Sequence, residues 1–170
     1  MLPDMRPNMR PNLRKTIPFA ALMVAALALG AQAALAGECP AGKGAADGQG
    51  QKAGATMPKG VTDTVIASTD LSTEPVAIDG RLFRLRKLVI EPGGVVPWHS
   101  HENRPAIIYV LRGEITEYAS TCTVPILHKA GEVTPETHQT AHWWKNTGKQ
   151  TAILLSADLF PTAASDAHTM

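Results

Sequence analysis

Short apolar segments, many of them rich in β-branched residues, follow one another from residue 62 onward and are separated by turn-forming residues. None shows a sustained helical period, and their length and composition predict β-strands. The expected strands cover residues 64–67, 81–90, 95–101, 106–111, 115–118, 124–127, 132–134, 142–145 and 151–159. The sequence Glu91-Pro92-Gly93-Gly94 predicts a turn after the second of them. Many short strands at close spacing indicate an all-β sandwich or barrel.

The first 36 residues follow a different pattern. A positively charged start precedes an almost uncharged apolar run at 17–31, and Ala34-Leu35-Ala36 fits the small-residue pattern of a cleavage site. These are the features of a secretory signal peptide. A membrane anchor is the alternative, but the run is shorter than the roughly 20 residues that a span needs. We therefore expect export to the periplasm or the medium, with residues 1–36 removed.

Residues 37–60 are rich in Gly and Ala and contain one large apolar side chain, Met57. Such a segment buries too little surface to offset its ordering entropy, so we expect it to be flexible. The β domain then covers 61–160 and a tail covers 161–170. The two cysteines are Cys39 and Cys122. An oxidising compartment favours a disulfide between them that holds the segment to the domain, and the alternative is two unpaired thiols.

Composition and charge narrow the function classes. The chain has 170 residues, which suits one domain, and its formal charge is +1 with no dense basic run. We therefore expect no nucleic-acid partner. The leader carries more basic than acidic groups, so its removal leaves a slightly acidic chain with no charge-based reason to bind anionic lipid. The expected partner is a small-molecule ligand, and a homodimer is considered as the assembled state.

Three histidines suggest a metal site. His99 and His101 are two residues apart in a predicted strand, so both imidazoles point to the same face. His142 begins another predicted strand. Three imidazoles that converge from neighbouring strands suit Fe(II), Mn, Ni or Zn and leave coordination positions for water or substrate. The alternative is that His99 and His101 face solvent at the end of a loop.

These residues resemble two motifs of the cupin family. Gly93, His99, His101 and Gly113 match the positions of the first motif, and the second is matched by Gly131, His142 and Asn146. The resemblance covers roughly residues 81–159. It implies a single-domain cupin-like jelly-roll barrel preceded by a signal peptide and a flexible Gly/Ala-rich segment. The leader and the two cysteines also look like those of small exported bacterial cupin-domain proteins.

The sequence departs from the family at several positions. Ala106 stands where the family has a glutamate ligand, and Thr137 and Gln139 replace a proline and a glycine of the second motif. With three neutral imidazoles alone, a bound ion would keep its full charge and act as a stronger Lewis acid. Certain cupin dioxygenases use three histidines without the glutamate, so the departure is compatible with an iron enzyme. Glu102 and His138 are considered as outer-sphere replacements.

Further residues near the motifs are candidates for catalysis or substrate contact. Tyr109 shares the inward face with the histidines if the strand keeps its register, and with Glu102 it is a candidate for proton transfer. The candidate substrate contacts are Trp98, Arg104, His138 and Trp144. Strand alternation points Trp144 inward and Trp143 outward. Packing and surface roles are the alternatives for all of them, and His128 and His168 are expected at the surface or at a strand edge.

These observations predict an exported, metal-binding cupin that acts as a metal-dependent, dioxygenase-like oxidoreductase on a small organic molecule. The metal ligands would be His99, His101 and His142. The alternative is a non-catalytic module that binds a small molecule or a metal. A third interpretation is a structural domain without a metal. Because fold does not dictate function, the sequence leaves the choice between enzyme and binding module open.

Overall fold

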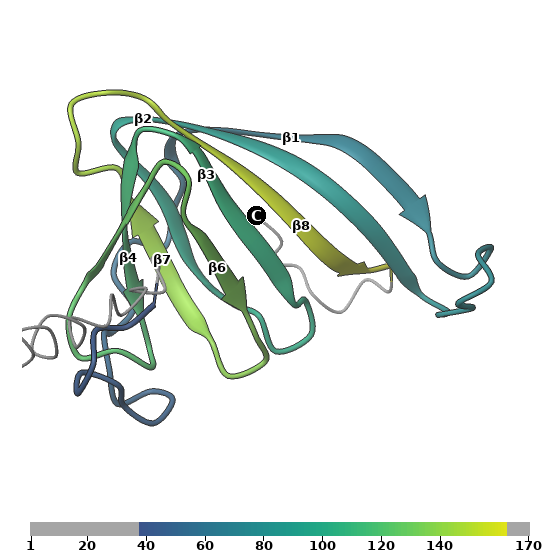
Figure 1. Ribbon diagram of the computed structural model, residues 1–170, viewed down its shortest axis with the longest axis horizontal. Coiled ribbons are helices and arrows are strands. Elements are labelled where there is room, and N and C mark those ends of the chain that lie inside the picture. Colours follow the sequence, from purple (N-terminus) through teal and green to yellow (C-terminus); the bar gives the residue numbers. More distant parts are fainter. Residues whose placement is uncertain (1–37, 163–170) are drawn as a thin grey trace, which may run out of the picture. The chain divides into compact units, whose positions relative to one another are not determined.

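The computed structural model describes residues 38–162, which belong to one compact unit of the chain (Figure 1). The expected signal peptide at 1–36, most of the expected tail and His168 lie outside the described residues. Within residues 38–162 the structure contains no segment that could cross a membrane as an apolar helix.

The described part of the chain is built from β-strands and contains no helix, as the sequence predicts. The strands are β1 (Lys59–Asp70), β2 (Arg81–Ser100), β3 (Ala106–Arg112), β4 (Glu114–Ala119), β5 (Ile126–Lys129), β6 (Val133–Glu136), β7 (Ala141–Lys145) and β8 (Ala152–Pro161).

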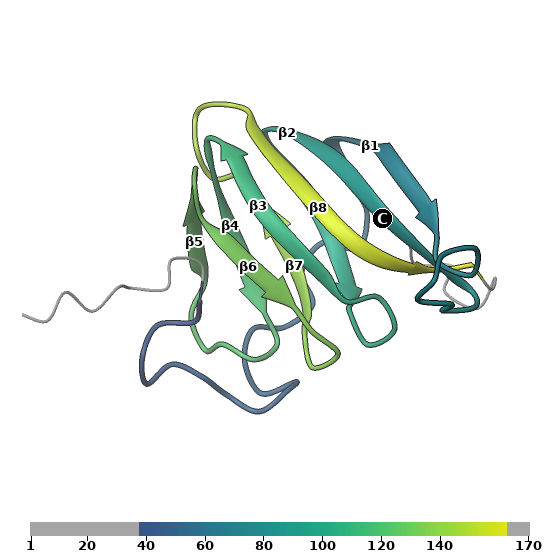
Figure 2. The same cartoon turned by 45° about the vertical axis from the view of Figure 1, so that its right-hand side comes forward.

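Strand β2 takes part in both halves of the curled sheet, one that contains β8 and one that contains β7. Its first half pairs with β1 on one side and β8 on the other, and its last residues pair with β7. From β8 the sheet continues through β3 to β6, and from β7 it continues through β4 to β5, always antiparallel. The sheet curls so that β4 and β7 stand opposite β8 and β3 (Figures 1 and 2). This arrangement is consistent with a cupin jelly roll.

The prediction of a turn at 91–94 is wrong. Strand β2 continues through these residues as one long strand that contains a bulge. Lys59 of β1 pairs with Val95, whereas Val61 already pairs with Ile90. A Cβ at Gly94 would lie 2.7 Å from the carbonyl oxygen of Glu91, so the bulge closes around a residue without a side chain. The Pro-Gly-Gly signal therefore marks a bend inside a strand rather than its end.

The main core lies between the two halves of the curled sheet. Inward-facing side chains alternate with exposed ones along β3, where Ala106, Ile108 and Val110 are buried. The buried apolar cluster consists of Leu88, Ile90, Val96, Ala106, Ile108, Val110, Ile115, Trp144, Ala152 and Leu154. Each large aliphatic member contributes about 1.5–3 kcal/mol through burial. Val96 and Trp144 belong to this core, so it packs against the last residues of β2 and against β7.

The segment at 37–60 was expected to be flexible, and the structure shows contacts that hold parts of residues 38–58 to the domain. Cys39 and Cys122 form a disulfide, and Gly44 pairs with Cys122 in an isolated β-bridge. The backbone N–H of Gly50 donates to the Ser120 carbonyl at 2.7 Å. A Cβ at Gly54 would lie 2.5 Å from the Trp143 ring. The glycines that suggested flexibility instead allow the backbone to lie directly against the domain.

Candidate metal centre

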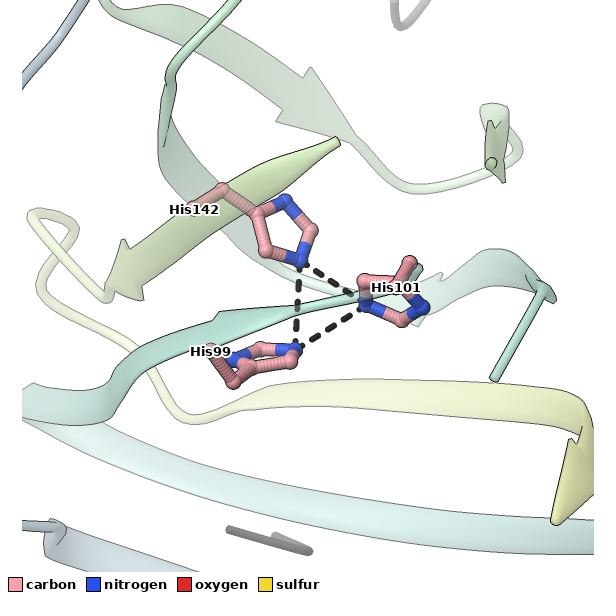
Figure 3. Close-up of side chains that lie close together, drawn as sticks. All are labelled: His99, His101 and His142. Atoms are coloured by element: carbon pink, nitrogen blue, oxygen red, sulfur yellow. Dashed lines mark hydrogen bonds between the residues drawn. The ribbon is translucent and has the colours of Figure 1, made fainter. Parts of the chain in front are cut away.

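The three motif histidines meet on one side of the barrel wall. His99 and His101 come from the end of β2, and His142 lies on β7 directly opposite His99. The Nε2 atoms are 3.1 Å apart for His99 and His101, 3.1 Å for His101 and His142, and 3.2 Å for His99 and His142. Figure 3 shows the three Nε2 atoms pointing toward one another. The expected convergence of two imidazoles from β2 with one from a neighbouring strand is confirmed.

Backbone carbonyls determine which ring nitrogen of His99 and His101 carries the proton. The Nδ1 of His99 lies 2.9 Å from the carbonyl oxygen of Pro97, and the Nδ1 of His101 lies 2.7 Å from that of Arg104. A carbonyl oxygen only accepts, so Nδ1 donates in both rings and Nε2 is left with a lone pair. Metal-binding histidines are oriented by contacts of this kind.

Burial keeps these imidazoles neutral. It lowers the pKa of His99 well below its ordinary value, and the neighbouring His142 and His101 lower it further. Burial, followed by the charge interaction with His142, lowers the pKa of His101 to about 3. Near neutral pH both rings are therefore uncharged bases, which is the form that binds a metal ion.

The donor set fits a divalent cation. Three lone pairs that face one another at 3.1–3.2 Å repel unless a cation lies between them. Two nitrogens that bind the same ion at about 2.1 Å are about 3.0 Å apart when the nitrogen–metal–nitrogen angle is 90°. They are about 3.4 Å apart when that angle is tetrahedral. The observed separations fall between these values, so the rings are placed for a shared ion without rearrangement.

Glu117 of β4 orients the third histidine, and no sequence pattern indicated this role. Its Oε1 accepts a hydrogen bond from the Nδ1 of His142 at 2.6 Å, and its Oε2 accepts one from the Nε2 of His128 at 2.8 Å. Burial alone would raise the pKa of Glu117, but the hydrogen bonds from His128 and His142 outweigh it and lower the pKa to about 2. The carboxylate is therefore ionised.

His128 was expected at the surface or at an edge; it lies on the edge strand β5, but the surface position is wrong. Its side chain on β5 is fully buried, and its ring lies 4.7 Å from that of Trp144. Strand β5 pairs with β4, which brings His128 opposite Ile115 and close to Glu117. A buried histidine with a carboxylate partner could not be recognised from a four-residue strand.

Glu136, the last residue of β6, is a second carboxylate that sequence reasoning missed. It is 1% exposed, and neither carboxylate oxygen has a hydrogen-bond partner among the described residues. Its Oε2 lies 3.2 Å from the Nδ1 of His142 and 3.8 Å from the Nε2 of His101. Burial, with a further contribution from the charge of Glu117, raises the pKa of Glu136 well above its ordinary value. Alternation with buried Thr134 along β6 is the only pattern that could have indicated its inward orientation.

A small cavity of about 30 Å³ adjoins the three histidines. Apolar side chains form much of its wall, and the polar side chains that line it beside the histidines are Arg86, Arg104 and Ser156. A volume of this size admits only a few water-sized groups. The cavity therefore suits a small ligand or one end of a larger one.

A cluster of arginine and aspartate side chains adjoins the cavity, and Arg86 and Arg104 belong to both. Asp158 on β8 is 1% exposed and accepts hydrogen bonds from Arg84 at 2.9 and 2.7 Å, from Arg86 at 3.3 Å and from Arg104 at 3.2 Å. Arg86 also pairs with Asp63. Three guanidinium groups thus face two carboxylates within this cluster. The cluster also explains why Arg104 is buried although most arginines are exposed.

Two of the expected ligand contacts line the cavity. Arg104 does so, and apart from its hydrogen bond to Asp158 the structure gives its guanidinium no other hydrogen bond within residues 38–162. Trp144 is 3% exposed and lines the cavity as strand alternation predicts, with its Nε1 3.3 Å from the Nε2 of His142. Trp143 points outward and stacks on Tyr118.

The other expected contacts lie elsewhere. Tyr109 is 38% exposed on the outer face of β3, because the turn at 101–105 shifts the alternation so that Ala106 and Ile108 face inward. Glu102 lies exposed in that turn, and His138 is exposed in the loop after β6. Trp98 is half-buried but does not line the cavity. The expectation that Tyr109 faces inward is therefore wrong, and neither Glu102 nor His138 reaches the cavity.

The fold and this site define a class: a small all-β domain of the jelly-roll type with a candidate histidine metal centre. Comparison with known proteins agrees with that description. Residues 86–158 match the family described as the cupin domain. That segment contains His99, His101, His142 and both buried glutamates.

The similar proteins share only part of their length or sequence with this chain. A germin-like protein (subfamily 2 member 2) of Arabidopsis thaliana is 34% identical over 91 residues, which cover 51% of this chain and 42% of that protein. The chain thus spans less than half the length of this curated relative.

Among solved structures, a protein named as a "predicted oxalate decarboxylase" from Thermotoga maritima has a TM-score of 0.51 at 22% identity and covers 65% of this chain and 92% of its own. The cupin domain of Schizosaccharomyces pombe Cnp3 has a TM-score of 0.49 at 15% identity, covering 61% of this chain and 67% of its own. At 22% identity the likeness to the Thermotoga maritima protein concerns the fold alone.

Proposed function

We propose that this protein is an exported, metal-dependent oxidoreductase that acts on a small organic molecule with dioxygen as the oxidant. The observation that carries the proposal is the convergence of three Nε2 lone pairs beside a cavity. His99, His101 and His142 would hold Fe(II), Mn, Ni or Zn. Such an ion supplies Lewis-acid polarisation of a bound oxygen atom and, if it is redox-active, electron transfer.

The charges around the cavity favour an anionic ligand. Arg104 lines the cavity and has N–H donors beyond the one bound to Asp158, and Arg86 lines it as well. Guanidinium groups bind carboxylates through paired hydrogen bonds. The small volume limits the part of the ligand that enters to a few atoms. We therefore propose a small carboxylate, or a molecule with a carboxylate at the end that enters the site.

Export is part of the same proposal. The leader-like pattern at 1–36 motivates it, and the disulfide between Cys39 and Cys122 supports it, because disulfides persist in oxidising compartments. The proposed location is the periplasm or the medium.

A non-catalytic binding module is the second candidate. The observation in its favour is that Tyr109 and Glu102, the proton-transfer candidates from the sequence, do not reach the cavity. This module would bind the same metal and the same class of ligand without turning it over.

Metal content tests the centre directly. Protein purified from the periplasm without added metal or chelator is analysed by inductively coupled plasma mass spectrometry. We expect about one divalent ion per chain in the unmodified protein and a loss of at least tenfold in His99→Ala, His101→Ala and His142→Ala. The matched control is His138→Ala, because His138 is exposed and away from the cavity. Equal metal content in all four variants would refute the site.

Ligand binding and oxygen consumption separate the two candidates. Oxalate, glycolate and acetate serve as carboxylate probes, and catechols, flavonols, diketones and thiols extend the oxygen-uptake screen. Arg104→Met should weaken carboxylate binding about 10–100-fold, as expected for the loss of a charged hydrogen bond. Arg112→Met is the control, since Arg112 is exposed. Carboxylate binding without oxygen uptake for any compound would favour the binding module.

A further inference from the structure

Glu136 is a buried acidic group without a partner. Its side chain is 1% exposed, and both carboxylate oxygens lack hydrogen-bond partners among residues 38–162. Removing a carboxylate from water without compensation costs several kcal/mol. Such a group is either protonated, as its raised pKa indicates, or stabilised by a cation or a donor that residues 38–162 do not supply.

The neighbours of Glu136 do not supply that donor. The Nδ1 hydrogen of His142 is directed to Glu117, 2.6 Å away, and the Nε2 of His101 carries a lone pair. The charge of Arg104 partly offsets the rise in the pKa of Glu136, but its guanidinium donates its hydrogen bond to Asp158. The Oε2 of Glu136 nevertheless lies 3.8 Å from the Nε2 of His101, which is the atom directed at the candidate metal position.

Strand pairing puts Glu136 beside the position where the cupin motif has a glutamate. Ala106 on β3 pairs directly with Glu136 on β6, and both side chains face inward. A carboxylate is missing at Ala106, and its cross-strand neighbour carries one. Directly paired residues in an antiparallel sheet have Cβ atoms about 4.5–5.5 Å apart, so the two positions reach the same region of the interior.

We propose that Glu136 supplies the carboxylate of this metal centre, from β6 rather than from β3. The inference rests on the proposed metal binding by His99, His101 and His142. It replaces the sequence-based expectation of a centre with three neutral ligands and full ionic charge. A carboxylate also shifts the preference of the centre toward hard ions such as Mn²⁺ and Fe²⁺.

The first experiment compares metal affinity and stability in the isosteric variant Glu136→Gln. Dissociation constants for Mn²⁺ and Co²⁺ are measured by chelator competition, and the visible spectrum of the Co²⁺ form reports its coordination. We expect Glu136→Gln to bind both ions at least tenfold more weakly and to change the Co²⁺ spectrum. Glu132→Gln, a neutralised carboxylate four residues earlier, should match the unmodified protein.

Stability without metal distinguishes a metal-binding role from a structural one. In the presence of chelator, Glu136→Gln should be as stable as the unmodified protein or more stable, because it removes a buried carboxylate that has no partner. A structural role predicts the opposite, with lower stability accompanying any loss of affinity. The double variant Ala106→Glu/Glu136→Gln should recover metal affinity by moving the carboxylate to the paired position.

The outcomes separate this inference from the proposed function. If the unmodified protein binds metal and Glu136→Gln binds it equally well, the role of Glu136 is refuted and the histidine centre stands. If the unmodified protein binds no metal, the proposed function is refuted and this inference with it. Weaker binding in Glu136→Gln with unchanged stability supports the proposal, whether or not the double variant folds.

Discussion

Glu117 and His142 are joined by a 2.6 Å hydrogen bond across β4 and β7, and the second oxygen of the same carboxylate accepts a hydrogen bond from buried His128. This contact makes His142 donate through Nδ1 and leaves its Nε2 lone pair directed at His99 and His101. The orientation of the candidate metal centre therefore depends on a residue that does not itself line the cavity.

Replacing this carboxylate should weaken metal binding without removing any of the three imidazoles. In Glu117→Gln the amide cannot accept from both histidines, so one of the two hydrogen bonds is lost and His142 is less well oriented. We expect metal affinity to fall about 10–100-fold, as for other residues that orient metal-binding histidines. Chelator competition measures the change, with exposed Glu74→Gln as the control. An affinity within twofold of the unmodified protein would show that His142 needs no such support.

The metal-free protein should lose stability on acidification. Burial lowers the pKa of His99, and it lowers that of His101 from 6.5 to about 3, so between these values the unfolded chain binds protons that the folded chain does not. The contribution of the two neutral imidazoles to the free energy of unfolding is complete above pH 6.5 and declines as the pH falls. The raised pKa of Glu136 acts in the opposite direction above pH 4.5, but two imidazoles outweigh one carboxyl.

Urea unfolding in chelator tests this dependence. The midpoint should be lower at pH 5 than at pH 7.5, and the difference should shrink in His101→Gln and persist in His138→Gln. A midpoint that is the same at both pH values would contradict the neutral, buried state of the imidazoles.

Reduction of the disulfide should destabilise the domain and release its N-terminal segment. Cys39 and Cys122 are 83 residues apart in sequence. Loss of such a link in a small secreted domain costs about 2–5 kcal/mol. Thermal unfolding with and without reductant should show a lower midpoint after reduction, and limited proteolysis should then cut first within residues 40–58. The double variant Cys39→Ser/Cys122→Ser is the control and should not respond to reductant.

Asp158 should be among the most sensitive positions for stability. Its carboxylate pairs with Arg84, Arg86 and Arg104, and its side chain is fully buried. Asp158→Asn leaves these guanidinium groups with one fewer negative partner, which we expect to cost about 3–5 kcal/mol. Urea denaturation measures the change, and exposed Asp79→Asn should stay within about 0.5 kcal/mol of the unmodified protein. A small effect at Asp158 would mean that water screens the cluster.

Local patterns were sufficient for part of this structure. Alternation along a strand put His99 and His101 on one face and Trp144 inward, because the side-chain period of a strand is a local property. The same rule failed at Tyr109, where the turn at 101–105 restarts the alternation at Ala106. It also could not show that the Pro-Gly-Gly sequence at 92–94 lies inside a strand, since a bulge depends on what the neighbouring strand does.

The sequence by itself determined the all-β class, the shared face of His99 and His101, the inward direction of Trp144 and the three histidines that meet. Only the tertiary structure decided that Glu117, His128 and Glu136 are buried around them and that Asp158 gathers three arginines beside the cavity. The reason is that burial of a charged side chain is set by partners on strands distant in sequence. Glu117 and Asp158 are stable inside the protein because pairing of those strands brings hydrogen-bond donors or guanidinium groups to them.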